Sequence, residues 1–131
     1  MKRFGLSSSE RIRSKKEFDL LYSAGKTVVS ADKRIKTVYF FEKNTKPEVK
    51  AAFAVSKKAG NAVWRNRVKR LLRVSYRLNK ESLLSTCTSN DIFLLVVFSP
   101  FSVNSNNFKK INLNDVLPGV IELIENIRQS L

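Results

Sequence analysis

Alternating apolar positions predict that the first half of the chain is mostly strand. The segments 26–30, 34–42 and 49–56 are rich in β-branched and aromatic residues, and we expect them to form antiparallel strands. Along the second segment, the odd-numbered side chains from Ile35 to Phe41 would face one side of a sheet and the even-numbered ones from Lys36 to Phe40 the other. Segment 91–100, "DIFLLVVFSP", is apolar on both faces, which predicts a strand in the middle of the sheet.

Helical signals flank these strands. Ser14 and Glu17 have the spacing of a capping box, which predicts a helix over about 15–23, and Gly25 suits the left-handed position that ends a helix. After a polar connection over 102–114, a last helix is predicted, with Asn114 as its cap and Pro118 in its first turn. Its apolar residues recur at helical spacing, at Val116, Val120, Leu123, Ile124 and Ile127.

A third helix, predicted over 61–79, has two chemically different faces. At about 100° per residue from Arg65, an arc of roughly 140° collects Asn66, Lys69, Arg70, Arg73 and Arg77. The opposite arc collects Trp64, Val68, Leu71, Leu72, Ser75 and Leu78, which we expect to pack on the sheet. Arg67 belongs to neither set, and its direction stays open between the helix end and the preceding loop.

The basic face of this helix has no counter-charge nearby. The chain carries 25 Lys and Arg against 11 Asp and Glu, a formal charge of +14, and residues 49–80 contain ten of these cations and no acidic residue. A solvated helical face normally interleaves Glu with Lys, so the imbalance favours a nucleic acid over solvent as the partner of this face. An anionic membrane is the other candidate polyanion, but the apolar face of the helix is needed by the sheet. We expect no membrane partner.

Composition excludes several kinds of site. The chain has one cysteine, Cys87, and no histidine, which excludes an internal disulfide, a zinc site and a histidine-based catalytic centre. Its few, scattered carboxylates argue against a protein nuclease that holds two metals. We find no signal peptide and no apolar run of about 18 residues, so we expect a cytoplasmic protein. The length of 131 residues predicts a single domain over 1–131, with residues 1–13 flexible.

A specific motif lies in the middle of this pattern. The stretch "VSKKAGNAVWRNRVKRLLR", Val55 to Arg73, resembles the signature of the bacterial ribonuclease P protein subunit, including its Ser-Lys-Lys strand end and its Arg-Asn-Arg triplet. "KKEFDLLYSAGK" is similar to the first helix of that family, and "DIFLLVVFSP" to its strand that ends near a proline. Departures are Ala52, where a Gly is frequent, and a long, Asn-rich connection over 102–114.

The resemblance implies a fold and a function. The fold is an α/β (α+β) two-layer sandwich, like domain 2 of ribosomal protein S5, with a four-stranded mixed sheet, about three helices and a left-handed crossover at the basic helix. The function is that of the protein subunit of ribonuclease P, which supports endonucleolytic removal of the 5′ leader from precursor tRNA. In that family the catalytic centre lies in the RNA, and Mg²⁺ is held mainly by the RNA and the substrate. The implied partners are the ribonuclease P RNA and the leader, with the free protein a monomer.

The family's binding residues carry over to positions of this chain. The resemblance implies that the catalytic RNA contacts Arg65, Asn66, Arg67, Lys69, Arg70, Arg73 and Arg77. It implies a leader cleft between the first helix and the sheet, lined by Phe18, Tyr22 and Tyr39, with Lys57 and Lys58 at its basic rim. No catalytic residue and no metal ligand of the protein is implied.

Two alternatives stay open at this point. Core packing would also explain Phe18, Tyr22 and Tyr39, because aromatic residues four apart on a helix are commonly buried, and it is the expected role of Trp64 and Cys87. A structural rRNA-binding ribosomal protein of similar size and charge is the alternative function.

Overall fold

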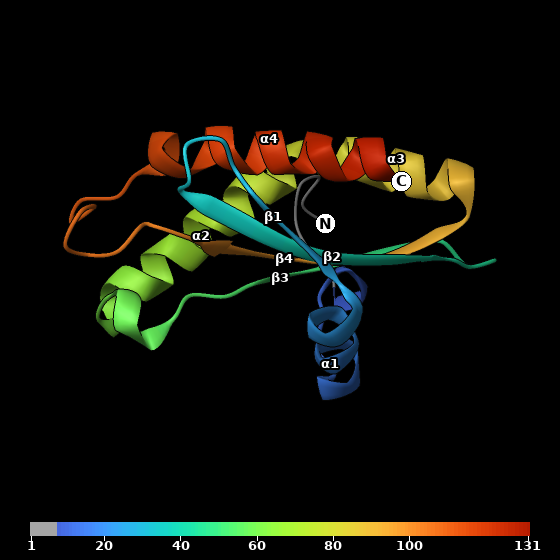
Figure 1. Cartoon of the computed structure of the whole chain (residues 1–131), viewed down its shortest axis with the longest axis horizontal. Coiled ribbons are helices and arrows are strands. Elements are labelled where there is room, and N and C mark those ends of the chain that lie inside the picture. Colours follow the sequence, from blue (N-terminus) through green and yellow to red (C-terminus); the bar gives the residue numbers. More distant parts are fainter. Residues whose placement is uncertain (1–7) are drawn as a thin grey trace.

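A computed structural model describes residues 8–131 and contains one four-stranded sheet with helices on both of its faces (Figure 1). The α+β class expected from the resemblance is confirmed. In chain order the elements are η1 (Ser8–Glu10), α1 (Lys15–Ala24), β1 (Lys26–Val29), β2 (Ile35–Lys43), β3 (Glu48–Phe53), η2 (Lys57–Ala59), α2 (Ala62–Asn79), α3 (Glu81–Asn90), β4 (Ile92–Pro100) and α4 (Leu113–Ser130).

The strand order is β1-β2-β4-β3. β4 is central as expected, antiparallel to β2 and parallel to β3. The expectation that the first three strands pair in antiparallel fashion is correct for β1 and β2 and wrong for β3, because β4 lies between β2 and β3. β4 is apolar on both faces, and the centre of the sheet is where such a strand buries the most surface. The parallel pair requires a crossover, which runs through α2 and α3. The left hand expected for it stays a prediction.

Two apolar layers sandwich the sheet. α2, α3 and α4 lie against one face and the short helix α1 against the other (Figure 1). Leu94, Val96 and Phe98 of β4 pack toward the three helices, whereas Leu95 and Val97 pack toward α1. β2 alternates in the same way, which confirms the two faces expected for this strand. Because α1 has ten residues, part of its face of the sheet stays open.

Four α-helices are present in the described part of the chain, where about three were expected. The unexpected one is α3, whose Ser and Thr residues have weak helix propensity and hide its pattern. Leu83 and Cys87, four residues apart, are its buried positions. The helix ends at Asp91, which adopts a left-handed conformation with φ 53°.

The helix ends differ from the expected ones in three places. α4 is capped by Asn112, which forms a capping box with Asp115, so the expectation of Asn114 was wrong and Pro118 lies beyond the first turn.

At α1, Ser14 accepts from the backbone N–H of Glu17 as expected, at 3.1 Å. The Glu17 carboxylate, however, accepts from Lys50 Nζ at 2.8 Å, which ties α1 to β3 and raises the pKa of Lys50.

Gly25 ends α1, but with φ −79° it is not left-handed, contrary to expectation. Its N–H donates to the carbonyl of Leu21 at 2.8 Å. A Cβ at this position would overlap that carbonyl oxygen and lie 2.9 Å from the Val38 side chain. The glycine is therefore required by the close approach of α1 to β2.

Part of the N-terminal segment expected to be flexible is packed on the sheet. Residues 1–7 lie outside the described residues. Arg11 forms an isolated bridge with Ala51 of β3, and the backbone N–H of Ile12 donates to Ala51 at 3.1 Å. This pairing adds a short extended segment to the β3 edge of the sheet. The Ile12 side chain is buried on the α1 side of the sheet. Within residues 8–131, no helix has the length and apolar character that crossing a membrane requires.

Candidate RNA-binding surfaces

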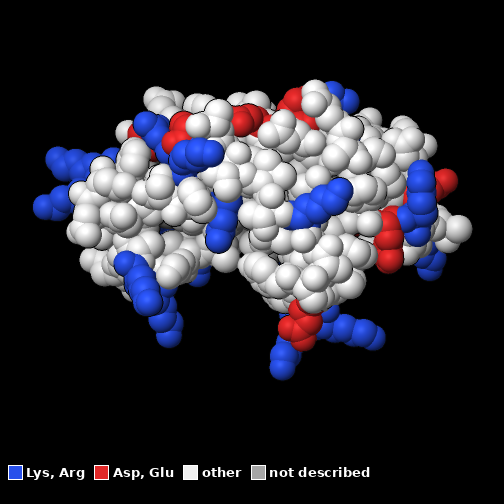
Figure 2. All heavy atoms as spheres, in the orientation of Figure 1, with Lys and Arg blue, Asp and Glu red and all other residues white. Residues whose placement is uncertain are grey.

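The basic face of α2 is solvent-facing along most of its length. We define the α2 ridge as Asn66, Arg67, Lys69, Arg70 and Arg73, which with Val63 line a shallow concavity of about 560 Å³. Asn61 caps the helix by accepting from the N–H of Trp64 at 2.9 Å, so the ridge begins one turn after a firmly held helix start. Figure 2 shows Lys and Arg side chains projecting from the end of the molecule where α2 begins.

The opposite face of α2 packs on the sheet largely as expected. Trp64, Val68, Leu72 and Ser75 are buried. Leu78, expected in this set, is 49% exposed, and Tyr76 is buried instead, against Phe53 and Phe98. The buried arc of α2 is thus shifted slightly toward its basic face, compared with the arc predicted from the sequence. The cations nearest to this arc therefore lie at the edge of the core.

The two arginines of the triplet diverge. Arg65 Nε donates back to the carbonyl of Gly60 at 3.1 Å, and Arg67 Nε donates to the carbonyl of Ile111 at 2.7 Å. Arg67 therefore reaches the connection before α4. This direction is neither of the two that the sequence left open, which were the helix end and the loop before α2. One backbone bond holds each guanidinium in place, and Asn66 between them is exposed.

Within residues 8–131, no cation of the α2 ridge forms an ion pair. The ion pairs present join Arg34 to Asp32 and Asp115, Lys50 to Glu17, Lys80 to Glu10, and Arg128 to Glu125. The ridge is therefore left without carboxylate partners, as a surface for a polyanion requires.

Arg73 joins the ridge to the open face of the sheet. Its guanidinium carbon lies 5.9 Å from the ring centroid of Phe53. The same side chain lines a second concavity, of about 230 Å³, together with Arg11 and Phe18. Burial, and then the charges of Arg11 and Arg77, lower the pKa of Arg73. Sequence reasoning missed Arg11 because only the bridge of the N-terminal segment to β3 brings it here.

Arg77 lies one turn beyond Arg73 and is half-buried. Its Nε is buried and has no hydrogen-bond partner among the described residues. A buried guanidinium N–H without an acceptor is costly for the fold, and because this nitrogen is shielded from solvent, an external anion does not reach it.

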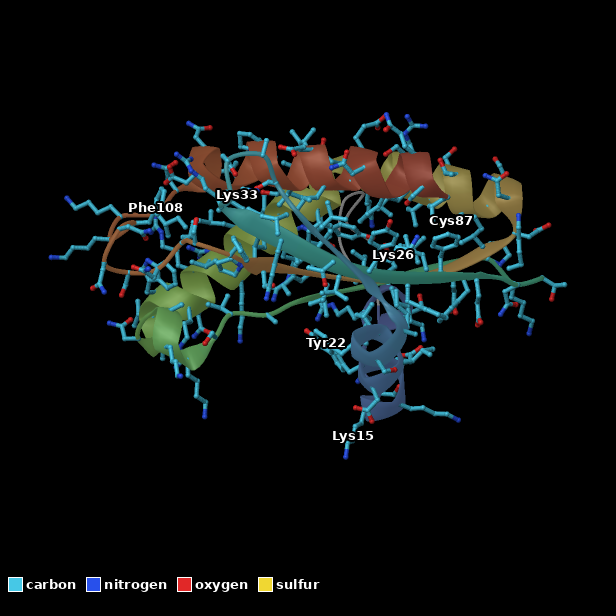
Figure 3. The ribbon with its side chains drawn as sticks, viewed as in Figure 1. Lys15, Tyr22, Lys26, Lys33, Cys87 and Phe108 are labelled. Carbon is cyan, nitrogen blue, oxygen red and sulfur yellow. The ribbon has the colours of Figure 1, made fainter. Side chains whose placement is uncertain are left out.

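Phe18 and Tyr22 come together on α1 as expected. Their rings stack with centroids 6.5 Å apart and an angle of 13° between planes. Phe18 is half-buried against the sheet, whereas Tyr22 is 57% exposed and projects from α1 below the sheet (Figure 3). Partial burial raises the pKa of Tyr22.

Tyr39 is not part of this group. It is 5% exposed and packs on the opposite face of the sheet, where its hydroxyl shares a hydrogen bond of 2.9 Å with Ser130 of α4. The core alternative holds for this residue, because β2 turns its odd-numbered side chains toward the three helices. Phe40, its neighbour, faces α1 and is the aromatic residue of β2 on the open face.

Lys57 and Lys58 are exposed in η2, which follows β3 after a short connection over residues 54–56. Lys58 lines a hollow with Phe101 and Asn104, separate from the one that Phe18 lines. Trp64 and Cys87 are buried as expected; the Trp64 Nε1 donates to the carbonyl of Phe108 at 2.9 Å, and burial raises the pKa of Cys87 to about 11. Among residues 8–131, no three Cys, Asp or Glu side chains gather as a metal site would require.

Comparison with known proteins identifies the family. A model of the family described as Ribonuclease P matches residues 6–115. A "Ribonuclease P protein component" of Staphylococcus haemolyticus is 35% identical over 80 residues, which span 61% of this chain and 67% of that protein. Another, of Syntrophus aciditrophicus, is 38% identical over 95 residues, or 72% and 74% of the two chains.

A solved structure shares the fold. The RNase P protein of Thermotoga maritima superposes with a TM-score of 0.68 at 24% identity, covering 89% of this chain and 96% of that one. The family match over most of the chain decides between the two functions expected from the sequence, and rules against a structural ribosomal protein. The chain belongs to the bacterial ribonuclease P protein family, whose members are subunits of a ribonucleoprotein enzyme of tRNA processing.

Proposed function

We propose that the α2 ridge, with Arg65 and Arg77, binds the RNA component of ribonuclease P, and that the open sheet face beside Phe18 and Tyr22 binds the 5′ leader of precursor tRNA. The observation that carries the proposal is the position of Arg73, which lines both concavities and so makes one continuous surface of them.

The ridge suits a folded RNA for two reasons. Guanidinium groups bind phosphate through forked hydrogen bonds, and the ridge is richer in Arg than in Lys. The Arg65 and Arg67 bonds to backbone carbonyls fix where these groups stand before RNA arrives, which lowers the entropy lost on binding. If about 6 to 10 phosphates are neutralised, affinity should fall roughly 10³ to 10⁵ fold between 50 and 200 mM salt.

The face beside α1 suits a single strand. Base stacking on an aromatic ring contributes about 1 to 3 kcal/mol per base with little sequence preference. Tyr22 offers an exposed ring, already stacked on Phe18, and Phe40 adds an aromatic edge on the same face. Lys57 and Lys58 stay in the proposal as exposed cations of η2, after β3, whereas the buried Tyr39 is removed from it.

Arg11, Arg73 and Arg77 supply the charge where the two surfaces meet. Arg11 and Arg77 each repel the guanidinium of Arg73. An RNA phosphate at this point would relieve this repulsion. We therefore assign to this position the RNA strand that passes from the α2 ridge to the open sheet face beside Phe18 and Tyr22. We call this face of the sheet the leader face.

The protein's contribution is binding and positioning. In this proposal Mg²⁺ is held mainly by the RNA and the substrate, as the resemblance implies, and no step of leader removal is assigned to a metal on this chain. In this proposal the chain forms a single domain over residues 1–131, and the free protein is a cytoplasmic monomer.

Reconstitution tests the proposal. The purified chain should increase leader cleavage by a bacterial ribonuclease P RNA at low Mg²⁺, where RNA alone is slow. The matched variant Arg65→Ala with Arg67→Ala should bind that RNA more weakly in a filter assay at the same salt. A wild-type chain that neither binds the RNA nor speeds cleavage would contradict the proposed function.

A further inference from the structure

A third concavity lies beyond the ridge, at the start of α2. It has a volume of about 890 Å³ and is bounded on one side by α2 and on the other by the β4–α4 connection, residues 101–112. Three cations and no carboxylate are among its lining residues, which are Asn61, Val63, Trp64, Arg67, Ser105, Asn106, Lys109 and Lys110. The sequence pattern of α2 did not point to the two lysines, because they lie far along the chain from that helix, beyond α3 and β4.

Hydrogen bonds fix the connection to η2 and α2. The N–H of Ser105 donates to the carbonyl of Ala59 at 2.7 Å. The carbonyls of Phe108 and Ile111 accept from the side chains of Trp64 and Arg67, at 2.9 and 2.7 Å. Lys109 and Lys110 lie between these two anchored carbonyls, so their backbone positions relative to α2 are fixed.

The connection is also ordered from within. The Asn104 side-chain oxygen accepts from the N–H groups of Asn106 and Asn107, at 2.9 and 3.1 Å. Arg34 lies over the ring of Phe108, 5.0 Å from its centroid. The Asn residues that make this segment look like a plain linker therefore give it a defined shape, at the left-hand end of the molecule where Phe108 is labelled (Figure 3).

The two lysines are exposed, and in residues 8–131 neither forms an ion pair. The nearest carboxylate that follows them in the chain, Asp115, is engaged elsewhere. It accepts from the N–H of Asn112 at 2.9 Å and lies 3.9 Å from Arg34. The lysines are thus unneutralised cations on a preformed support.

We propose that Lys109 and Lys110, together with Arg67, form a second phosphate-binding surface that holds the backbone of the ribonuclease P RNA across the start of α2. The inference rests on the proposed function and extends it from one helix to a loop. Three concavities follow one another: this one shares Arg67 with the ridge, and the ridge shares Arg73 with the leader face. The lysines lie at the end of this series farthest from Phe18, so their phosphates belong to the catalytic RNA and not to the leader.

Binding of the catalytic RNA alone, without precursor tRNA, tests the charges. Lys109→Ala with Lys110→Ala should lower affinity about tenfold at roughly 0.1 M salt, and should make the slope of log K against log salt shallower by about 2. Lys109→Arg with Lys110→Arg should restore both. The matched control is Lys15→Ala with Lys16→Ala, an exposed pair on α1 that should leave affinity and slope unchanged.

A tethered probe tests the location. The native Cys87 is buried, so a cysteine introduced by Asn106→Cys can carry a cleavage reagent selectively. It should cut the catalytic RNA at a discrete site in the complex. Thr45→Cys, in the turn between β2 and β3 at the other end of the sheet, should give no cuts at that site (Figure 1).

The outcomes separate this inference from the proposed function. If the wild-type chain binds the RNA and the alanine pair binds with the same affinity and salt slope, the second surface does not exist and the ridge proposal stands. If binary affinity is unchanged while only precursor with a long leader binds less well, the lysines contact substrate and the assignment to catalytic RNA is wrong. If the wild-type chain itself does not bind the RNA, the proposed function fails first.

Discussion

The guanidinium of Arg73 lies over the ring of Phe53, 5.9 Å from carbon to centroid, and this pair stands where the helix α2 meets the edge strand β3. Phe53 is itself stacked on Phe98 in the core, with 6.3 Å between centroids. The cation therefore has a rigid apolar support, although its neighbours Arg11 and Arg77 repel it. Retention of three like charges at one point is unfavourable for folding alone, and it is favourable for binding an anion.

Arg73→Ala should separate these two effects. Stability should change by less than about 1 kcal/mol, because a lost cation–π contact of roughly 0.5–1 kcal/mol is offset by relief of repulsion. Affinity for the ribonuclease P RNA should fall about tenfold at moderate salt. Urea unfolding and filter binding measure the two quantities. The control is Arg128→Ala on α4, whose cation is paired with Glu125 and which should leave RNA affinity unchanged. A large loss of stability with unchanged affinity would show that Arg73 serves the fold.

Tyr22 is the best probe of leader binding. Its ring is 57% exposed, so Tyr22→Ala should change stability by less than about 0.5 kcal/mol. If the ring stacks a leader base, the variant holoenzyme should lose roughly 1 to 3 kcal/mol of binding to precursors with long leaders and nothing with short ones. Leu20→Ala, also exposed on α1, is the control. Equal losses for both leader lengths would contradict a role in stacking the leader.

Phe18→Ala tests the core alternative. Phe18 is half-buried against the sheet, so removal of its ring should cost stability as well as leader affinity. A protein that remains folded but no longer distinguishes leader lengths supports the leader face. Loss of the cooperative unfolding transition would assign Phe18 to the core instead.

Local patterns predicted most elements correctly but could not predict their pairing. The alternation in β2 and the two faces of α2 depend on periodicity, which neighbouring residues determine. The position of β4 between β2 and β3 is a tertiary property, since it depends on which strand can be buried on both faces. α3 escaped notice because its buried residues, Leu83 and Cys87, are diluted by Ser and Thr.

The candidate site was predictable where it lies on one helix and missed where it depends on distant segments. The cations of α2 follow from its sequence. Arg11 and the pair Lys109 and Lys110 join this surface only through the bridge to Ala51 and the hydrogen bonds to α2. Tyr39 was assigned to the leader cleft by resemblance, although the alternation of β2 already placed it on the same face as Ile35. The local pattern was the better guide for this residue.

Gly25→Ala should destabilise the protein through a clash alone. The φ of −79° is accessible to alanine, but its Cβ would overlap the carbonyl oxygen of Leu21. We expect a loss of about 1–3 kcal/mol, as for overpacked positions, together with weaker leader binding because the end of α1 must move. Ala24→Gly, one residue earlier and exposed, is the control and should cost about 0.5–1 kcal/mol. Urea unfolding that ranks the two variants equally would contradict the close-approach explanation.

Cys87 should make stability depend on alkaline pH. Burial raises the pKa of its thiol from about 9 in the unfolded chain to about 11 in the folded one. Below pH 9 the thiol is protonated in both states. Between pH 9 and 11 only the unfolded chain releases the proton. This group therefore makes the free energy of unfolding fall as pH rises through that range. The difference in that free energy between wild type and Cys87→Ala should narrow over this range. A constant difference would mean that the thiol is reached by water in the folded state.

The buried ion pair between Lys80 and Glu10 should stabilise the fold more than an exposed one. Lys80 Nζ lies 2.6 Å from the Glu10 carboxylate, and the Lys80 side chain is 5% exposed. Glu10→Gln removes one charge of this pair and should cost about 1–3 kcal/mol of unfolding free energy, because the desolvated ammonium keeps its charge. Glu17→Gln is the matched control: its partner Lys50 is 21% exposed, so the loss should stay below about 1 kcal/mol. Since Glu10 holds the N-terminal segment that carries Arg11, Glu10→Gln should also weaken RNA binding, whereas Glu17→Gln should not. Equal unfolding free energies for the two variants would show that burial of Lys80 does not set the strength of this contact.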